Sequence, residues 1–262
     1  MPRNLTLYAA FGLAVVGVPG LAAAQEVPAG DTAAIEASPD TGETLPKQSV
    51  QLSGEIGVVS EYRFRGVARS GGDPAVQGNL DLVHSSGFYL GTWISSVDER
   101  TFGHGDWELD AYAGWTGPVG SASLDVGAIA YTFPDAGAGD FDYYEGYASL
   151  SYTLGPARAT GGAAYAPEQD GLGGRDNLYL FGELEGGLPG TPVTLKAHLG
   201  YTDGALTYTG DGTAFDWLVG AEYALWGPLT ASLSYVGAQG RAPAGSFNPA
   251  GDTVVVGLRA AF

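Results

Sequence analysis

The feature that most restricts the fold is an alternation of apolar and polar residues that begins at position 50. Even positions from 50 to 64 carry Val, Leu, Gly, Ile, Val, Ser, Tyr and Phe, whereas odd positions from 51 to 65 carry Gln, Ser, Glu, Gly, Val, Glu, Arg and Arg. Successive side chains of a β-strand point to opposite faces, so this segment predicts one strand over 50–65. Arg63 and Arg65 then share a wet face with Glu55 and Glu61, opposite an apolar face.

The same alternation recurs in eleven further segments, which makes twelve predicted strands. The clearest are 106–115, 193–202, 216–225 and the closing segment 252–262. Weaker versions cover 75–84, 88–98, 121–133, 141–153, 157–166, 176–186 and 229–238. Many short strands separated by turn residues predict an all-β chain.

The connections between these strands alternate between two kinds. Tight turns rich in Gly and Pro fall at 85–87, 116–120, 154–156, 187–192 and 226–228. Longer connections fall at 66–74, 99–105, 134–140, 167–175, 203–213 and 239–250. Because Gly and Pro supply the sharp turns of hairpins, the pattern predicts a series of consecutive hairpins.

Two architectures fit strands that are joined in this way. In a soluble sandwich the apolar faces line a core, whereas in an outer-membrane barrel they meet lipid and the polar faces line the interior. The barrel is favoured because ionised groups recur on the polar faces, aromatic residues cluster near strand ends, and the strand number is even. Residues 48–262 are therefore predicted to form a single antiparallel transmembrane β-barrel of twelve strands.

The amino terminus has the pattern of a secretory signal peptide. A positive residue precedes the apolar run 5–18, a Pro-Gly pair breaks the run, and Ala22-x-Ala24 offers a cleavage site. Residues 1–24 are predicted to be removed on export, since the run is too short and too interrupted for a membrane anchor. Residues 25–47, rich in Pro, Ala, Thr and acidic side chains, are predicted to be a disordered periplasmic leader.

The composition narrows the classes of function. The 262 residues include 29 acidic and 11 basic side chains, for a net charge of −18, and no cysteine. Nucleic acid is not an expected partner, because phosphate binding needs clustered Lys and Arg. Without cysteine, disulfides, thiolate metal sites and Cys nucleophiles are excluded.

The carboxyl terminus carries a further signal of the outer membrane. The last nine residues, VVVGLRAAF, form an apolar face that ends on Phe262. This ending resembles the assembly signal of bacterial outer-membrane barrels; the alternative is an edge strand that happens to end in Phe. The expected partners are outer-membrane lipids and lipopolysaccharide, and the barrel assembly machinery through Phe262.

Three motifs follow one another in residues 61–93, EYRFRGVARSGGDPAVQGNLDLVHSSGFYLGTW. They are Tyr62-x-Phe64-Arg65-Gly66, Pro74-x-x-Gln77-Gly78 and Gly87-Phe88-Tyr89-x-Gly91-x-Trp93. In this order they resemble the amino-terminal signature of the TorF family of proteobacterial porins, and the likeness extends more loosely over 50–262. Family members often have Asp where Glu61 stands and a Ser-Gln-Ser-like step where Ala68-Arg69-Ser70 stands. The resemblance implies an outer-membrane barrel with a pore, and it supplies no substrate and no catalytic residues.

A set of polar residues is predicted to line the interior of this barrel. A hairpin centred near residue 70 would place Glu61 opposite Asn79, Arg63 opposite Gln77, and Val59 opposite Asp81. The full pore-lining set comprises Glu55, Glu61, Arg63, Arg65, Gln77, Asn79, Asp81, Asp106, Glu108, Asp110, Asp125, Glu145, Glu183, Glu185, Lys196, His198, Asp216 and Glu222. Acidic residues dominate it, which predicts a preference for cations. The two arginines either oppose this acidic wall and set a transverse field, or pair with nearby carboxylates and stiffen the barrel.

The sequence thus predicts a porin-like channel for passive diffusion of small solutes or ions, with a closed structural or adhesive barrel as the alternative. Asp106-x-Glu108-x-Asp110 is not expected to bind Ca²⁺, because strand neighbours two apart lie about 6.8 Å from each other. No metal or other cofactor is expected. No nucleophile motif or metalloprotease motif is present, and His198 near Lys196 lacks a recognisable nucleophile, so the chain is not expected to be an enzyme.

Overall fold

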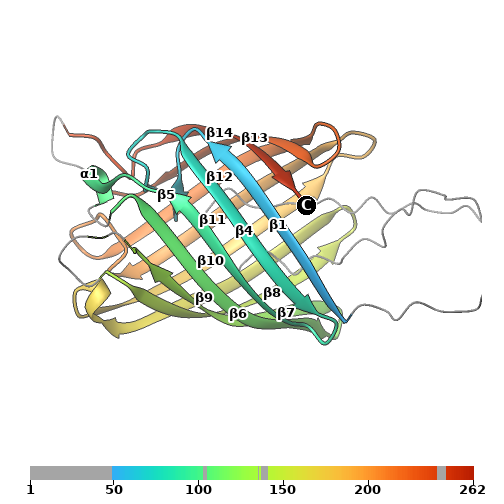
Figure 1. Ribbon diagram of the computed structural model, residues 1–262, viewed down its shortest axis with the longest axis horizontal. Coiled ribbons are helices and arrows are strands. Elements are labelled where there is room, and N and C mark those ends of the chain that lie inside the picture. Colours follow the sequence, from blue (N-terminus) through green and yellow to red (C-terminus); the bar gives the residue numbers. More distant parts are fainter. Residues whose placement is uncertain (1–48, 103–104, 135, 137–140, 241–245) are drawn as a thin grey trace, which may run out of the picture.

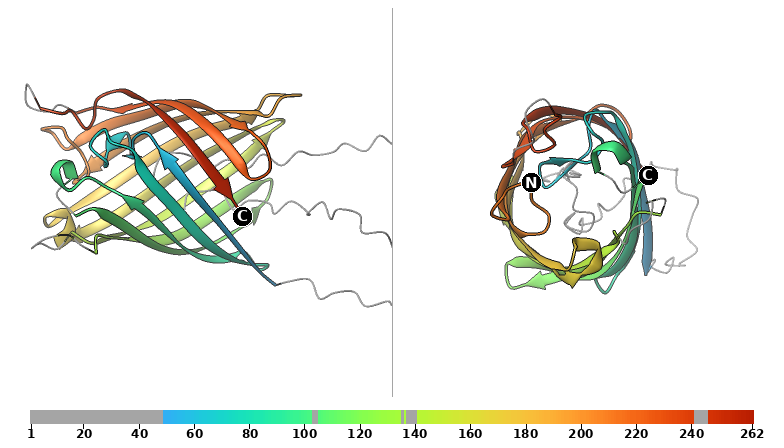
Figure 2. Two further views of the ribbon diagram at one scale, coloured as in Figure 1. Left: turned by 45° about the horizontal axis from the view of Figure 1, so that its top comes forward. Right: turned by 90° about the vertical axis from the view of Figure 1, so that its left-hand side faces the viewer.

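The structure is a closed antiparallel barrel, in which each strand pairs with its neighbours along the chain and β1 closes against β14 (Figures 1 and 2). It is a computed structural model that describes residues 49–102, 105–134, 136, 141–240 and 246–262. The barrel strands are β1 (Val50–Val59), β4 (Ala75–His84), β5 (Phe88–Ser96), β6 (Trp107–Val119), β7 (Ala122–Thr132), β8 (Tyr143–Leu154), β9 (Ala157–Gln169), β10 (Arg175–Gly187), β11 (Val193–Gly204), β12 (Thr213–Ala224), β13 (Leu229–Ala238) and β14 (Thr253–Ala261). The predicted all-β barrel of twelve strands is confirmed. The predicted signal peptide (1–24) and leader (25–47) lie outside the described residues.

The remaining elements are short. β2 (Arg63–Phe64) and β3 (Val67–Ala68) form a two-stranded sheet of their own, and a helical turn follows at α1 (Glu99–Phe102). A 3-10 turn lies at η1 (Asp170–Leu172). Among the described residues, no helix has the length and apolar character needed to span a membrane.

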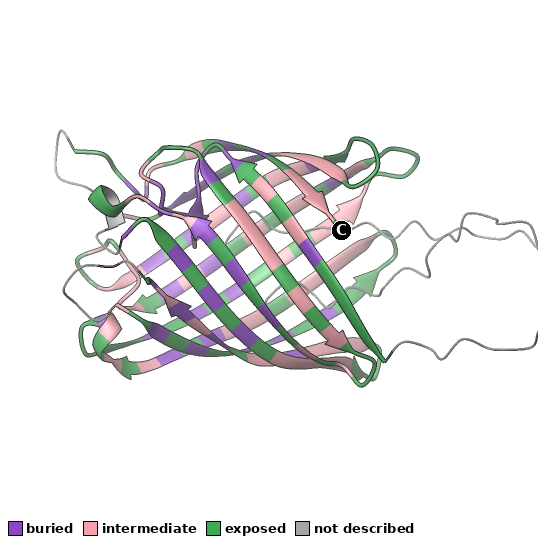
Figure 3. Cartoon of the chain, viewed as in Figure 1, coloured by how far each residue is buried: buried purple, intermediate pink, exposed green. Residues whose placement is uncertain are grey.

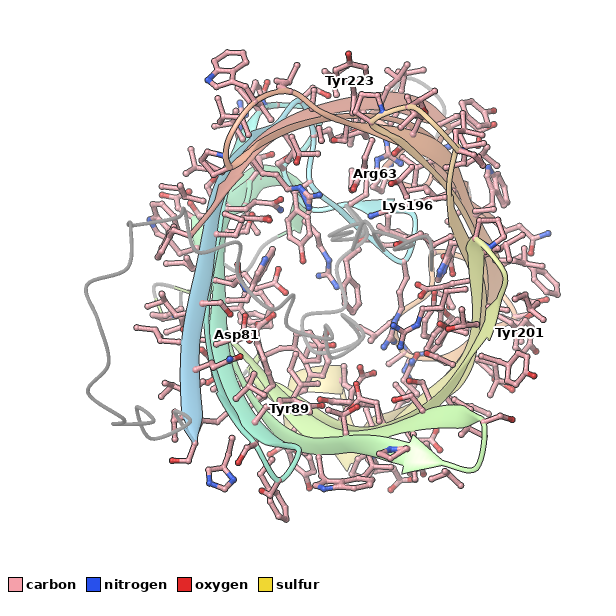
Figure 4. The ribbon with its side chains drawn as sticks, turned by 90° about the vertical axis from the view of Figure 1, so that its right-hand side faces the viewer. Arg63, Asp81, Tyr89, Lys196, Tyr201 and Tyr223 are labelled. Carbon is pink, nitrogen blue, oxygen red and sulfur yellow. The ribbon has the colours of Figure 1, made fainter. Side chains whose placement is uncertain are left out.

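The barrel wall has an apolar outer face and a polar inner face. In β12, Val219 is 63% exposed, whereas Asp216 and Glu222 on the opposite face are 2% and 4% exposed. Bands of buried and exposed positions alternate along strands such as β8 and β10 (Figure 3). In the view along the barrel, Tyr201 and Tyr223 point away from the lumen (Figure 4). A continuous apolar belt of this kind is unfavourable against water and suits the hydrocarbon of a bilayer.

The two ends of the barrel differ in the length of their connections. The short-turn end holds the connections 85–87, 120–121, 155–156, 188–192 and 225–228. The long-loop end holds 60–74, 97–106, 133–142, 170–174, 205–212 and 239–252. Because the number of strands is even, β1 begins and β14 finishes at the short-turn end (Figure 1).

Inward-facing glycines let aromatic rings lie flat along the inside of the wall. Gly91 of β5 pairs with Tyr112 of β6, and a Cβ on Gly91 would lie 2.6 Å from the Tyr112 ring. Gly127 of β7 pairs with Tyr147 of β8 in the same manner. A ring that lies over a neighbouring glycine occupies space that a side chain would otherwise fill, so these pairs need glycine for close approach.

The first hairpin differs from the prediction in both length and register. β1 ends at Val59, which pairs with Ala75, and Glu55 rather than Glu61 lies opposite Asn79. The predicted pairing of Arg63 with Gln77 and the extension of the strand to 65 are therefore wrong. The shift is by an even number of residues, so the inward-facing set on β4 remains the predicted one.

Residues 60–74, which we call loop L1, fold back into the lumen instead of continuing the strand. All residues from 61 to 70 are buried. Tyr62 packs on Trp93 with ring centroids 5.2 Å apart, and Phe64 packs on Tyr131 at 5.6 Å. The prediction placed Tyr62 and Phe64 on the lipid side, and this is corrected because the two rings join an aromatic cluster inside the long-loop end of the barrel.

Candidate functional site

The tip of loop L1 is a tight hairpin that the motif Arg65-Gly66 makes possible. β2 and β3 pair through Arg63 with Ala68 and Phe64 with Val67, which leaves a two-residue turn. Both turn residues have positive φ, 49° for Arg65 and 74° for Gly66, as a type I′ turn requires. Among the described residues, Arg65 is the one non-glycine residue in this region of φ. Such strain persists where surrounding contacts outweigh it.

Gly66 also lies close to the barrel wall, where a Cβ would collide with the carbonyl oxygen of Gly237 in β13. We therefore expect Gly66→Ala to displace the hairpin, with a cost of at least about 1–3 kcal/mol for the φ strain alone. Gly120 is the matched control: its φ is 62° and no atom lies within 4 Å of its Cβ position. Urea unfolding of both variants measures the difference. Equal losses of stability would show that contact with Gly237 contributes nothing.

Arg63 fastens the base of the hairpin to the loop that precedes β14. Its guanidinium lies 2.8 Å from the Glu61 carboxylate, and it donates hydrogen bonds to the carbonyl oxygens of Pro249 at 3.0 Å and Gly251 at 2.7 Å. A further bond reaches the carbonyl oxygen of Gly66. Arg63 is 3% exposed and binds loop L1 to the loop before β14. It therefore does not line a strand wall, contrary to the prediction. The same correction holds for Glu61, its partner in the loop.

Arg65 projects from the hairpin tip onto the opposite wall. One terminal guanidinium nitrogen lies 2.6 Å from Glu145 Oε2, and Tyr131 donates a hydrogen bond to the same oxygen at 3.1 Å. The guanidinium also lies 4.1 Å from the centre of the Tyr179 ring, which is cation–π geometry. Arg65 belongs to the loop, outside the spanning strands; burial acts to lower its pKa, but the Glu145 carboxylate raises it and the net shift is upward.

These contacts correct the predicted placement of Arg65 on the first strand. Arg65 at the tip of loop L1 is in direct contact with the Glu145 carboxylate. These two charges therefore do not face each other across open water. Of the two roles left open for the arginines, pairing with nearby carboxylates is the one that the geometry shows.

Arg69 was missed by the sequence analysis and adds a further contact between loop L1 and the wall. Its guanidinium lies 4.7 Å from the centre of the Phe64 ring, and it interacts electrostatically with Glu108 of β6. Glu108 and Asp110 are 0% exposed beneath loop L1. The loop thus meets the wall through aromatic rings and through buried charges of both signs.

A second charged network lies on the inner wall toward the short-turn end. Lys196 of β11 lies 2.7 Å from Glu222 of β12 and 3.8 Å from Glu185 of β10. Arg259 of β14 lies 2.8 Å from Glu222 and 3.4 Å from Glu55 of β1. Figure 4 shows Lys196 pointing into the lumen. Glu222 is the centre of this network because both cations contact it.

Between the two ends, tyrosines hold further carboxylates against the wall. Tyr89 donates a hydrogen bond to Asp125 at 2.6 Å, and Tyr112 donates one to Asp81 at 2.5 Å. Figure 4 shows Tyr89 and Asp81 on the inner face. A carboxylate that is bonded in this way keeps its charge toward the lumen with a fixed orientation.

His198 lies in a polar cluster on the same wall. Its ring nitrogens lie 3.1 Å from Glu183 and 3.1 Å from Asp216, and the hydroxyl of Tyr179 lies 2.7 Å from Nε2. Because Tyr179 also carries the Arg65 guanidinium on its ring face, this cluster connects the wall to the tip of loop L1. Among the described residues, no group of three His, Cys, Asp or Glu side chains has an arrangement suited to a metal ion.

The structure divides the predicted lining residues into three groups. Those on the inner face of the strands are Glu55, Gln77, Asn79, Asp81, Glu108, Asp110, Asp125, Glu145, Glu183, Glu185, Lys196, His198, Asp216 and Glu222. Glu61, Arg63 and Arg65 lie in loop L1. Asp106 is an exception, since β6 begins at Trp107 and Asp106 is exposed in the connection before it. Whether these residues line an open pore stays a prediction.

The sequence analysis overlooked several inward-facing residues that contact this set. Arg259 and Arg158 occupy the polar positions of their strands, so the same alternation could have identified them. The contacts of Tyr89, Tyr112 and Tyr179 could not be found in this way, because their partners lie on other strands or in loop L1.

The fold is similar to that of two solved structures with TM-scores of 0.54 and 0.50. The chain is similar to the NanC porin, with a TM-score of 0.54, 11% identity, and coverage of 80% of this chain and 99% of that one. A chain from work on the in-meso crystallization of membrane proteins gives a TM-score of 0.50, 11% identity, and coverage of 80% and 83%. The COG4313 outer membrane channel from Pseudomonas putida F1 gives 0.43, 15% identity, and coverage of 86% and 99%.

Comparison of sequences gives the family. No curated protein matches the chain. A family model does match residues 43–262, and its description is "Bacterial protein of unknown function (Gcw_chp)". That model does not bear the TorF name, so the TorF resemblance stays a prediction. Because the match covers the whole barrel, the chain belongs to the bacterial Gcw_chp family.

Proposed function

We propose that this protein is a porin-like channel of the bacterial outer membrane that lets small solutes or ions diffuse passively. The observation that carries the proposal is the closed barrel with an apolar outer belt and an inner wall of charged residues. A polar interior is what an outer-membrane barrel with a water-filled channel requires. The similarity of its fold to a porin supports the proposal.

The channel would prefer cations. On the inner faces of the strands, carboxylates outnumber basic side chains, and rings of acidic groups favour cation passage. The carboxylates are Glu55, Asp81, Glu108, Asp110, Asp125, Glu145, Glu183, Glu185, Asp216 and Glu222, and the basic residues are Lys196, Arg158 and Arg259.

Planar-bilayer recording tests both parts of this proposal. The mature protein, residues 25–262, would be refolded and placed between unequal KCl solutions. Discrete openings with a reversal potential on the cation-selective side are the expected result. A reversal potential on the anion-selective side would contradict the predicted selectivity.

A second candidate is favoured by loop L1. Because residues 61–70 are all buried and two arginines fasten the loop at its base and tip, a barrel that stays sealed would have a structural or adhesive role. Such a barrel would insert into the bilayer without openings at any voltage. Neither candidate function involves a catalytic residue or a cofactor.

The proposed partners are outer-membrane lipid, lipopolysaccharide, and the barrel assembly machinery, which would bind the exposed C-terminal ring. Phe262 is 74% exposed, and its backbone exchanges two hydrogen bonds of 2.9 Å with Gly54. These bonds extend the short seam between β1 and β14, which pairs Glu55–Val59 with Gly257–Ala261.

Two changes at Phe262 distinguish recognition of its ring by the assembly machinery from closure of the seam between β1 and β14. Phe262→Ala keeps the backbone bonds to Gly54 and is expected to lower assembly in cells while refolding in detergent stays normal. Deletion of Phe262 removes the bonds and is expected to impair both, because the two bonds are worth about 1–3 kcal/mol together. The folded fraction, seen as heat-modifiable migration in electrophoresis, is the measurement. Normal assembly of Phe262→Ala would contradict recognition of the ring.

A further inference from the structure

We call the contact between loop L1 and the inner wall of β6 and β8 the seal. It contains more carboxylates than cations. Glu108, Asp110 and Glu145 are each 0% exposed there, and they meet the guanidinium groups of Arg65 and Arg69, which are 2% and 4% exposed. Glu61 and Arg63 neutralise each other within the loop. If every group is ionised, the seal holds one negative charge in excess and no solvent to screen it.

The hydrogen bonds of the seal show where this excess lies. Glu145 is paired, since Arg65 and Tyr131 both bond its Oε2. In the part of the chain that the structure describes, no well-formed hydrogen bond reaches the four buried carboxylate oxygens of Glu108 and Asp110. The excess negative charge therefore lies on Glu108 and Asp110, and the buried side chains around them determine whether it is neutralised.

The hydroxyl groups of Tyr62 and Tyr143 belong to the same cluster. Among the described residues, neither hydroxyl makes a well-formed hydrogen bond, but both interact electrostatically with Glu108, and the Tyr62 hydroxyl is close enough to Glu108 to act as a donor. Tyr62 comes from loop L1 and Tyr143 from β8, so the two hydroxyls approach the carboxylate pair from two sides. Buried donors and acceptors that gather from several elements without well-formed hydrogen bonds require a physical explanation.

Among the described residues, the charged and titratable groups facing the pair are few. Loop L1 contributes Tyr62 and Arg69, β7 contributes Tyr131, β8 contributes Tyr143 and Glu145, and Tyr208 lies beyond Arg69. Arg69 compensates one of the two carboxylates. Glu108 and Asp110 stand two positions apart on one strand face, about 7 Å from each other, so the second negative charge is close to the first. Two such carboxyl groups in a dry site do not both stay ionised.

We propose that Glu108 and Asp110 form a binding site for one proton, and that loop L1 seals the lumen only while this proton is bound. When the proton leaves, the uncompensated carboxylate requires water, and water can reach it only if the loop moves away from β6. Acidic solution therefore keeps the barrel sealed, and raising the pH releases the loop.

The position of the loop can be measured independently of conductance. Val67 of β3 is 8% exposed and the chain has no cysteine, so Val67→Cys introduces one thiol that is hidden while the loop is docked. Its labelling rate with a water-soluble maleimide is divided by the rate for Ser86→Cys, an exposed turn residue, which removes the pH dependence of the thiol itself. This ratio is expected to rise with pH, by up to about tenfold per pH unit for one linked proton.

Substitutions in the site give the decisive comparison. With Asp110→Asn or Glu108→Gln in the Val67→Cys background, the excess charge is gone and the ratio is expected to stay low at every pH. Asp125→Asn is the matched control, because this inward carboxyl group is bonded by Tyr89 outside the seal, and the ratio should rise as in the parent. A ratio that does not change with pH in the parent, or that still rises in both site variants, would overturn the proposal.

Two further outcomes distinguish the proton site from a metal site and from the proposed channel function. A chelator that raises the ratio at acidic pH would show that a metal cation occupies the site, and this would also overturn the proposal. Bilayer conductance that rises with pH is expected if the protein conducts, and that expectation rests on the proposed function. A silent barrel whose labelling ratio still rises with pH would contradict the channel while supporting the proton site.

Discussion

Arg65→Met is expected to release loop L1 and increase the conductance of the barrel. The substitution removes the 2.6 Å ion pair with Glu145, whose side chain is 0% exposed, and leaves that carboxylate with Tyr131 as its remaining hydrogen-bond donor. Loss of one partner of a buried pair costs about 3–5 kcal/mol, because the other charge stays buried without compensation. The contact with the Tyr179 ring is lost as well. The docked position of the loop should then no longer be the most stable one.

Two measurements report the release. Single-channel recording should show larger openings than in the parent protein, and the normalised labelling of Val67→Cys should be faster. The double variant Arg65→Met/Glu145→Met is the control, since replacing both partners of a buried pair by apolar side chains is often neutral or stabilising. It should return the loop to its docked position. If the single variant conducts and labels like the parent, the Arg65–Glu145 pair does not hold the loop.

Glu222→Gln is expected to lower both the stability of the barrel and its preference for cations. Glu222 lies 2.7 Å from Lys196 and 2.8 Å from Arg259, so it joins β11, β12 and β14. Without it, Lys196 retains a contact to Glu185 at 3.8 Å and Arg259 retains one to Glu55 at 3.4 Å, both longer than the contacts to Glu222. A loss of about 3 kcal/mol is expected, at the lower limit for a broken buried pair because these second partners remain.

Glu185→Gln separates the two effects. It removes the same charge from the same network, but its carboxylate is the more distant partner of Lys196 and its side chain is 32% exposed. The reversal potential in a KCl gradient should shift toward zero in both variants, whereas the midpoint of urea unfolding should fall clearly only in Glu222→Gln. An unchanged reversal potential in both would mean that this network does not contribute to selectivity.

The local pattern of the sequence predicted the inner and outer faces of the barrel well. On β12, the positions of Trp217, Val219 and Tyr223 indicated the lipid side, and Asp216 and Glu222 indicated the lumen; the structure has this arrangement. The reason is that side-chain direction in a strand depends on a period of two residues, which is a local property. The same rule would have identified Arg259 on the inner face of β14.

The first hairpin shows what a period of two cannot distinguish. Pairing Val59 with Ala75 instead of Asp81 is a shift by an even number of residues, which leaves the side chains of β1 and β4 on their predicted faces. Tyr62 and Phe64 continue the apolar pattern of β1, so they match a lipid-facing strand as well as they match a loop packed inside the barrel. Alternation alone therefore could not locate the end of β1 at Val59.

The sequence by itself determined the strand number, the alternation of short and long connections, and which side chains of the barrel strands face inward, because each of these depends on neighbours a few residues apart. Only the tertiary structure decided that Arg63 and Arg65 hold a loop in the lumen and that Glu108 and Asp110 are buried beneath it. Arg65 and Glu145 are separated by 80 positions in the chain. Their contact requires closure of the barrel and packing of Phe64 and Tyr62 on its inner wall, and such long-range packing has no signature in the local alternation of residues.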